Sequence, residues 1–98
     1  MTRDGIKTEI VRIFWEQFEI KDPGLDEDLG DAYEFDSIDA VELLREIELL
    51  LRTKLTQTEK KMAMEIRTIA QILDYVEALA ATRAGASDIE PNKKKRSR

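Results

Sequence analysis

The stretch "FDSIDAVELLREIELLLR", residues 35–52, decides the fold because its apolar residues recur every three or four positions. Such spacing places them along one side of an α-helix and predicts a helix from about Ser37 to Arg52. The side expected to face the core carries Ala40, Leu43, Leu44, Ile47, Leu50 and Leu51. The opposite side carries Asp39, Glu42, Arg45, Glu46 and Glu48 together with three apolar residues, Ile38, Val41 and Leu49. Apolar side chains within an acidic, outward-facing surface predict a contact site for another protein.

The start of this helix contains a serine that the helix does not need. Serine is a common N-cap, but Asp36 is an equally good one, and Asp39 places a second carboxylate in the first turn, where the helix dipole favours it. If Ser37 were the cap, the third helical residue would be Ala40, which cannot return a capping hydrogen bond. We therefore predict that Asp36 is the N-cap and that Ser37 is the first helical residue, with its hydroxyl free. An anion attached to this hydroxyl would lie near backbone N–H groups that have no helical partner.

The segment before this helix predicts one further helix and a long loop. Residues 4–19 have a helical apolar stripe and Asp4 as a reasonable N-cap. Residues 21–35 contain glycine, proline and many acids, which predicts a connection without regular structure. Connections of this length are uncommon in small domains and are often functional. We expect its larger apolar side chains to hold it against the core, namely Leu25, Leu29 and Tyr33.

The segment after the central helix predicts two more helices. A short one covers about residues 57–65, begins at Thr56 or Thr58, and is expected to bury Met62, Ala63 and Ile66. The last begins with a capping box formed by Thr68 and Gln71. Its apolar stripe is Ile69, Ile72, Leu73, Val76, Leu79 and Ala80, and Gly85 is expected to end the regular pattern.

Together these segments predict an all-α fold, a four-helix bundle with a long loop between the first two helices and a short third helix. No β-strand pattern is found. We expect residues 1–83 to form this helical domain. Residues 84–98 hold one aliphatic residue larger than alanine and end in "KKKRSR", so we expect a disordered basic tail.

The composition excludes several kinds of chemistry. The 98 residues include no cysteine and no histidine, so disulfides, thiol catalysis and a Ser-His-Asp triad are all excluded. No other residue is suited to activate a serine, so Ser37 is interpreted as a residue modified by another enzyme.

The charge distribution points to the kind of partner. The net charge is −5, but residues 22–48 contain eleven acidic residues and one basic residue. Such a segment attracts basic surfaces and repels nucleic acid. Because the sequence shows neither a signal peptide nor an apolar run long enough to span a membrane, we expect a soluble, cytoplasmic protein.

The stretch "FDSIDAVELLREIE" resembles the prosthetic-group attachment motif of acyl carrier proteins, D-S-L-[DE] followed by a helical V-E-L-type run. The segment "TIAQILDYVEAL" is similar to the closing helix of that family, and the resemblance covers about residues 4–82. It implies an acyl-carrier-like helical bundle.

The resemblance also implies a function and its residues. Ser37 would receive 4′-phosphopantetheine from coenzyme A, through a phosphopantetheinyl transferase (holo-synthase), which makes the chain a phosphoprotein. The thiol of this arm would carry acyl intermediates of fatty-acid, polyketide or related lipid biosynthesis. The chain itself would be a monomeric, non-catalytic carrier, with a cleft for the acyl chain. Partner enzymes with basic docking patches would contact the acids Asp36, Asp39, Glu42, Glu46 and Glu48 and the apolar Ile38 and Val41.

Several residues depart from the family pattern. Glu34 stands where the family often has glycine, and Arg45 where it often has an apolar residue. The segment "TQTEKKMAMEI" is longer than usual and locally basic through Lys60 and Lys61. These departures suggest a specialised carrier with dedicated partners.

Two alternatives for the function stay open. The chain would be an aminoacyl (peptidyl) carrier in nonribosomal-type synthesis, or an acidic helical interaction module in which Ser37 is unmodified. Trp15 is interpreted as covering the edge of the core, with the acyl cleft and a partner contact as alternatives. The basic tail is interpreted as solvated, with tethering as its alternative.

Overall fold

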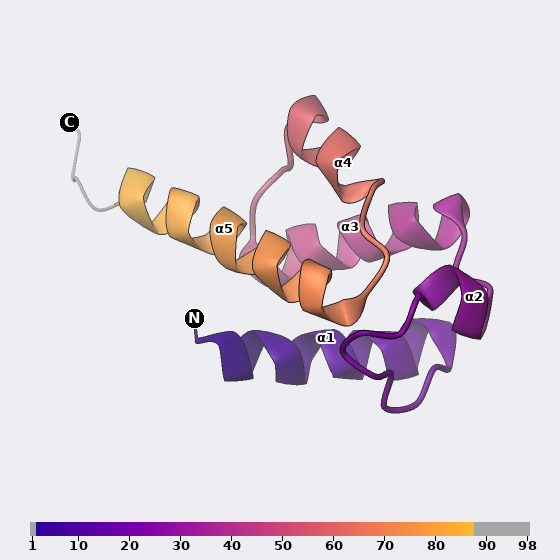
Figure 1. The fold of residues 1–98 in the computed structure, drawn as a ribbon. Coiled ribbons are helices and arrows are strands. Elements are labelled where there is room, and N and C mark those ends of the chain that lie inside the picture. Colours follow the sequence, from indigo (N-terminus) through magenta and orange to yellow (C-terminus); the bar gives the residue numbers. More distant parts are fainter. Residues whose placement is uncertain (1, 88–98) are drawn as a thin grey trace.

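The computed structural model describes residues 2–87, with side chains to residue 83, and in that part it contains five α-helices and no β-strand. The helices α1 and α5 lie side by side and run in opposite directions (Figure 1). The helix α3 packs against α1, and α4 packs against α3. The helix bounds are α1 (Arg3–Phe18), α2 (Leu29–Tyr33), α3 (Ser37–Leu51), α4 (Gln57–Ala63) and α5 (Ile69–Ser87). The predicted all-α bundle is confirmed, with one more helix than expected.

The core forms where the apolar stripes of α1, α3 and α5 meet. Burial of these stripes removes apolar surface from water and is the main favourable contribution to folding. The buried residues of the three helices are Ile6, Ile10, Ile13, Phe14, Leu43, Leu44, Ile47, Ile69, Ile72, Leu73, Val76 and Leu79. All of them were expected on the inward faces. Five further residues expected there are only half-buried, namely Phe18, Ala40, Leu50, Leu51 and Ala80.

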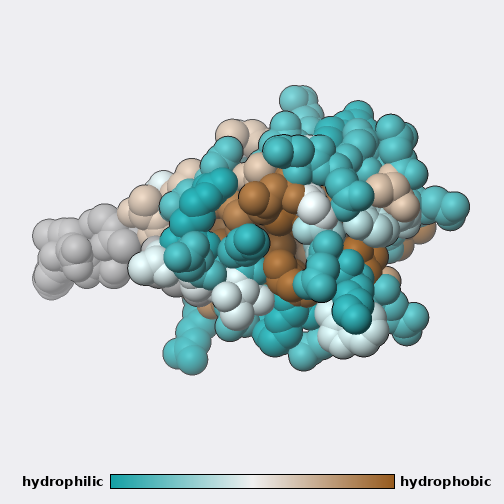
Figure 2. All heavy atoms as spheres, turned by 60° about the horizontal axis from the view of Figure 1, so that its bottom comes forward, coloured by the Kyte–Doolittle hydropathy of each residue, from teal (hydrophilic) through white to brown (hydrophobic). Residues whose placement is uncertain are grey.

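Figure 2 shows the molecule turned so that the side at the bottom of Figure 1 faces the viewer. Hydrophilic side chains cover most of it, and hydrophobic side chains gather near its middle (Figure 2). Among the residues with described side chains, the large exposed apolar residues outside α3 are Trp15, Leu25, Met62 and Met64. Exposed apolar surface is therefore not confined to the acidic helix.

The first helix begins at Arg3, one residue earlier than the predicted range, and its N-cap lies two residues before the predicted one. The Thr2 hydroxyl accepts a hydrogen bond from the Gly5 backbone N–H at 3.1 Å, so Thr2 is the N-cap of α1. The prediction of Asp4 as N-cap is wrong, because the helix already begins at Arg3 behind the Thr2 cap and Asp4 lies in its first turn. The helix ends at Phe18, since Glu19 has a left-handed backbone with φ of 58°.

The loop predicted over residues 21–35 contains the short helix α2, so the expectation of an irregular connection is wrong for its second half. The reason is a local capping signal, in which the Asp28 carboxylate accepts a hydrogen bond from the Asp31 N–H at 3.0 Å. Of the three expected anchors, Leu29 is buried and Tyr33 packs against the core.

The third expected anchor, Leu25, is 41% exposed, so that prediction is wrong for its side chain. Leu25 holds the loop through its backbone, because its carbonyl accepts a hydrogen bond from the Ala70 N–H at 3.0 Å. The Leu29 N–H in turn donates to the Arg67 carbonyl at 2.8 Å. Two backbone hydrogen bonds thus fix the loop to the start of α5.

The N-cap of the short helix α4 is Thr56, which is one of the two predicted caps. Thr56 and Glu59 form a capping box. Ala63 is buried and Ile66 half-buried as expected, but Met62 is 61% exposed, so its predicted burial is wrong. The helix is only seven residues long, and its single buried residue is Ala63. An inward face this narrow leaves no room for Met62.

The last helix starts with the predicted capping box, in which Thr68 and Gln71 exchange hydrogen bonds of 3.1 and 3.2 Å. It continues beyond Gly85 to Ser87, so the prediction that the regular pattern ends at Gly85 is wrong. Glycine inside a helix costs only about 1 kcal/mol relative to alanine, which a long helix tolerates. The predicted basic tail falls mostly on residues 88–98, which lie outside the described residues.

An ion pair ties α4 to α5. Arg83 donates from Nη1 and Nη2 to the two carboxylate oxygens of Glu59, at 2.7 and 2.8 Å, and Nη2 also donates to the Lys54 carbonyl at 3.1 Å. The Tyr75 hydroxyl donates to the Glu59 carbonyl at 2.7 Å. The hydrogen bonds from Arg83, with one from the Thr56 backbone, lower the pKa of Glu59 to about 2. Burial raises the pKa of Tyr75 to about 12.

Replacing Glu59 with glutamine is expected to lower the free energy of unfolding by about 1–2 kcal/mol at pH 7, because charge-assisted hydrogen bonds are lost. A carboxylate whose pKa is lowered on folding stabilises the fold above its unfolded pKa, and this stabilisation is lost as the pH falls through the folded value. The difference between wild type and Glu59→Gln should therefore shrink between about pH 4.5 and pH 2. Urea unfolding followed by circular dichroism at several pH values measures it.

The matched control for this prediction is Glu9→Gln. Glu9 also pairs with an arginine, Arg12, at 2.7 Å, but both side chains are more than a third exposed. Exposed pairs contribute little, so this variant should unfold almost like the wild type. Equal effects of the two substitutions would contradict the special role of the Glu59–Arg83 pair.

Candidate functional site

The site is built around the first turn of α3. The Asp36 carboxylate accepts a hydrogen bond from the Asp39 N–H at 3.0 Å, and the Asp39 carboxylate accepts one from the Asp36 N–H at 3.1 Å. The two aspartates therefore form a capping box, in which Asp36 is the N-cap, and Ser37 is the first residue of the helix. Ser37 is exposed, and its hydroxyl forms no hydrogen bond with the part of the chain that the structure describes. The predicted arrangement of these three residues is confirmed.

Aromatic packing fixes the position of this turn. The ring of Phe35 stacks on Phe14 of α1, with centroids 5.4 Å apart, and meets Phe18 edge-on at 5.2 Å. The Phe35 N–H also donates to the Leu29 carbonyl at 3.2 Å. The residue directly before Asp36 is thus fastened to both α1 and α2.

Glu34 completes the turn with a left-handed backbone, φ 58°, at the end of α2. Its N–H donates to the Gly30 carbonyl at 3.0 Å. A left-handed backbone is easy for glycine and costly for other residues. Glu34, which stands where the resembled family often has glycine, therefore adopts a backbone conformation that glycine would adopt at lower cost.

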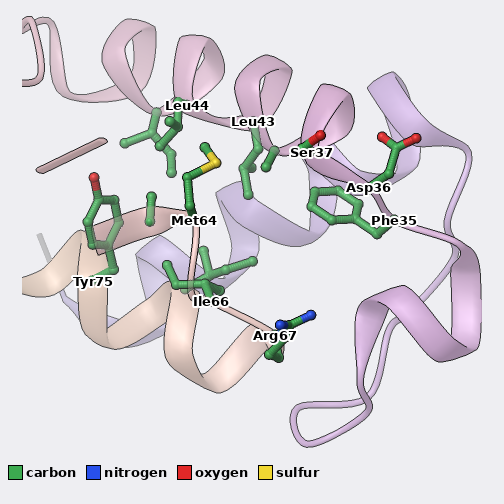
Figure 3. Close-up of a pocket in the computed structure, with 13 residues that line it drawn as sticks. Phe35, Asp36, Ser37, Leu43, Leu44, Met64, Ile66, Arg67 and Tyr75 are labelled. Atoms are coloured by element: carbon green, nitrogen blue, oxygen red, sulfur yellow. The ribbon is translucent and has the colours of Figure 1, made fainter. Parts of the chain in front are cut away.

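A cavity of about 220 Å³ lies beneath Ser37, between α3, α4 and α5. Ser37, Asp36 and Phe35 are at one end of it, and Tyr75 is at the other (Figure 3). Its wall is mainly apolar, with Asp36 and Arg67 as its charged residues. The apolar lining comprises Phe35, Ala40, Leu43, Leu44, Ile47, Ala63, Met64, Ile66 and Ile72. An apolar wall of this kind favours an aliphatic group over a charged one.

Part of this lining was not identified from the sequence. Helical spacing finds Leu43, Leu44 and Ile47 as one inward face, but it does not show that α4 and α5 stand away from this face. Met64, Arg67 and Tyr75 line the cavity from elements distant in sequence. Arg67 follows α4 in a segment without helical periodicity, so no sequence signal marks it.

The outer face of α3 carries the predicted contact residues. Ile38, Val41 and Leu49 are 77%, 53% and 71% exposed, which confirms that they face outward. Asp39, Glu42, Glu46 and Glu48 are half-buried on the same helix.

One of these acids also has a structural contact. The Glu48 carboxylate accepts a hydrogen bond from the Leu55 N–H at 2.8 Å. Its charge is therefore partly engaged within the chain, like that of Asp39, whose carboxylate accepts the Asp36 N–H.

Trp15 lies apart from this site. Its side chain is 55% exposed and lines a shallow groove on α1 with Val11 and Lys21. Trp15 is absent from the lining of the cavity beneath Ser37, so it does not form part of an acyl cleft there.

Within residues 2–87 no helix combines the length and apolar character needed to cross a membrane. The same residues contain no cluster of acidic side chains that could hold a metal ion.

A free serine hydroxyl at a helix start, beside an apolar cavity in a small helical bundle, is the arrangement expected of a carrier-type domain. A protein-family model described as "phosphopantetheine attachment site" matches residues 8–76. The chain therefore belongs to this family of phosphopantetheine-bearing carrier proteins, of which the acyl carrier proteins are members. No curated protein and no solved structure gave a significant match.

Domains of this family are the attachment site of 4′-phosphopantetheine, which is bound covalently. The residues present fit such a group. Ser37 offers an exposed hydroxyl with no competing hydrogen bond in the described part of the chain, and the helix start stays capped without it. The cavity next to it has room for part of an attached chain.

Proposed function

We propose that Ser37 carries the 4′-phosphopantetheine arm and that the protein holds acyl intermediates on it for partner enzymes of fatty-acid, polyketide or related biosynthesis. The observation that supports this most is the position of the exposed Ser37 hydroxyl at one end of an apolar cavity (Figure 3). The arm supplies the thiol that forms a thioester with the cargo, which a chain without cysteine lacks.

The chain's own residues hold and orient this site. Asp36 and Asp39 keep the first turn of α3 rigid, so the attachment point has a fixed direction. Phe35 fastens this turn to α1. The carrier is proposed to be modified and loaded by other enzymes and to catalyse nothing itself.

The apolar lining supports an acyl cargo over an aminoacyl one. Leu43, Ile47 and Ile72 are buried side chains of the cavity wall, and they offer no hydrogen bond to an ammonium group. A charged group that leaves water for such a wall loses its hydration without compensation. An aliphatic chain gains about 0.8 kcal/mol for each methylene group buried.

The acids of α3 support docking on basic enzyme surfaces, including that of a phosphopantetheinyl transferase. Glu42 and Glu46 lie one turn apart on α3, and the exposed Ile38 and Val41 add apolar contacts. We propose these residues, with Asp36, Asp39 and Glu48, as the docking surface. Charged rims of this kind mainly speed encounter and set orientation, which suits a carrier that visits several enzymes.

Replacing both Glu42 and Glu46 with lysine is expected to slow modification by the transferase about tenfold at low ionic strength, because electrostatic steering is lost. Helicity should stay close to that of the wild type, since both side chains reach solvent. The rate of arm transfer, followed by mass spectrometry at several salt concentrations, measures the effect.

The matched control reverses two acids elsewhere, Glu19 and Glu65, which are exposed and have no described ion pair. This double variant has the same net charge but should keep the wild-type rate. Equal slowing of both variants would show that net charge alone, and not the α3 surface, determines the rate.

The proposed function is tested by incubating the full chain with coenzyme A, Mg²⁺ and a broad-specificity phosphopantetheinyl transferase. Intact mass should increase by one phosphopantetheine group, and fragmentation should place it on the peptide that contains Ser37. A folded sample that gains no mass would favour the unmodified interaction module.

The cargo is tested with coenzyme A thioesters as donors, so that the arm arrives already loaded. A medium-length aliphatic acyl group is expected to raise the melting temperature above that of the unloaded holo form, because the cavity buries it. An alanyl group should leave the melting temperature unchanged. Stabilisation by the alanyl group alone would favour an aminoacyl carrier.

The cytoplasmic location and the monomeric state stay predictions from the sequence.

A further inference from the structure

A second groove, between α3 and α4, borders the proposed docking surface, with which it shares Val41 and Glu48, but its charged lining is mainly positive. It has a volume of about 280 Å³. It adjoins the cavity beneath Ser37, since Leu44 and Met64 line both. Its lining consists of Val41, Leu44, Arg45, Glu48, Gln57, Lys60, Lys61 and Met64.

The floor of this groove is apolar and uncovered. Val41 is 53% exposed and Met64 is 43% exposed, although both lie next to the buried Leu44. No segment within residues 2–87 covers them. Exposed apolar groups bordered by charge mark surfaces that bind a partner.

The rim carries three cations from two helices, Arg45 on α3 and Lys60 and Lys61 on α4. None of the three forms an ion pair within the described part of the chain. Glu48 is the one acid in the lining, and its carboxylate accepts the Leu55 N–H. The groove is thus a local positive site on a chain whose net charge is −5.

We propose that this groove binds a partner protein through an apolar side chain flanked by carboxylates. The apolar side chain would fill the space over Val41 and Met64. The carboxylates would pair with Arg45, Lys60 and Lys61. The argument is charge complementarity, since three unpaired cations around an apolar floor attract that combination.

Two other occupants fit the charges less well. The chain's own "KKKRSR" segment is basic and would be repelled by the rim. An anionic membrane would meet the rim but also the acids Asp39, Glu42 and Glu46 on the same helix, which repel it.

This inference rests on the proposed carrier function and narrows its partners. An enzyme that docks on α3 would meet acids near Ser37 and cations near Arg45. Its own surface must therefore be basic where it faces Ser37 and acidic where it faces Arg45. A partner with a purely basic surface would be repelled at the groove. A docking surface with both acidic and basic residues is specific because it repels partners whose charges do not match.

The test is a titration of the ¹⁵N-labelled full chain, followed by the shifts of its backbone amides, with two synthetic helical peptides as probes. Both peptides carry the same leucine stripe, flanked by glutamates in one and by lysines in the other. The glutamate peptide is expected to shift the amides around Lys60, Lys61 and Met64, which line the groove from the α4 side. The lysine peptide is expected to shift those around Asp39 and Glu42 instead.

Charge reversal locates the binding site. The double variant Lys60→Glu/Lys61→Glu should weaken binding of the glutamate peptide at least tenfold. The control Lys7→Glu/Lys21→Glu makes the same change of net charge at exposed lysines outside the groove, and it should bind almost as the wild type does.

Three results of these peptide titrations would overturn the proposal. These are no shift with the glutamate peptide, shifts at the same residues with both peptides, or equal weakening in the two double variants. Binding of phosphatidylglycerol vesicles that is lost in Lys60→Glu/Lys61→Glu would overturn it in favour of a lipid surface. Attachment of the arm to Ser37 is measured separately by mass, so a failure of the groove leaves the carrier function standing.

Discussion

Replacing Ser37 with alanine is expected to abolish attachment of the phosphopantetheine arm completely. The arm needs an oxygen at this position to bond to its phosphorus atom, and alanine has none. The fold should be unaffected, because Asp36 and Asp39 cap α3 through each other and Ser37 takes no part in their hydrogen bonds. Intact mass after incubation with coenzyme A and transferase measures the loss, and far-ultraviolet circular dichroism measures the helicity.

Ser87→Ala is the matched control, since it removes another serine hydroxyl at the end of α5, far in sequence from the motif. This variant should gain the arm at the wild-type rate. If the Ser37→Ala chain still gained the arm, the attachment site would lie elsewhere and the proposed role of Ser37 would be wrong.

Replacing Phe14 with alanine is expected to lower the free energy of unfolding by about 3–5 kcal/mol, the usual cost of removing a fully buried aromatic ring. Phe14 is 0% exposed, and its ring packs against both Phe18 and Phe35, with centroids 5.4 Å away in each case. Domains of this size have a total stability of only about 5–15 kcal/mol, so much of the margin would be lost. Urea unfolding followed by circular dichroism measures the change.

The neighbouring residue provides the control for this prediction. Trp15 is also a large aromatic residue of α1 but is 55% exposed, so Trp15→Ala should cost less than about 1 kcal/mol. Circular dichroism is the suitable signal, because this substitution removes the only tryptophan. Similar losses in the two variants would show that the aromatic cluster of Phe14, Phe18 and Phe35 is not the centre of the core.

The sequence predicted those parts of the site that depend on neighbours along the chain. The cap formed by Asp36 and Asp39 follows from a spacing of three residues, so it was identified together with the free Ser37. The outward position of Ile38 and Val41 follows from helical periodicity. Both need only the geometry of one helix.

Features that depend on contacts between segments were missed. The fastening of Leu25 through its carbonyl to Ala70 involves no side chain, so hydropathy does not reveal it. The exposure of Met62 depends on how α4 sits on α3. The cavity beneath Ser37 arises from the spacing of three helices, which no single stripe encodes.

The left-handed helix ends have a consequence for how this carrier can change. Glu19, Glu34 and Arg52 end α1, α2 and α3 with positive φ values between 55° and 58°, and none of them is glycine. Each left-handed residue of this kind costs roughly 1–2 kcal/mol, part of which a glycine would recover. The bundle thus keeps a reserve of stability at three helix ends, none of which lines the cavity. A lineage that reshapes the cavity for a new cargo has this reserve available to offset the cost.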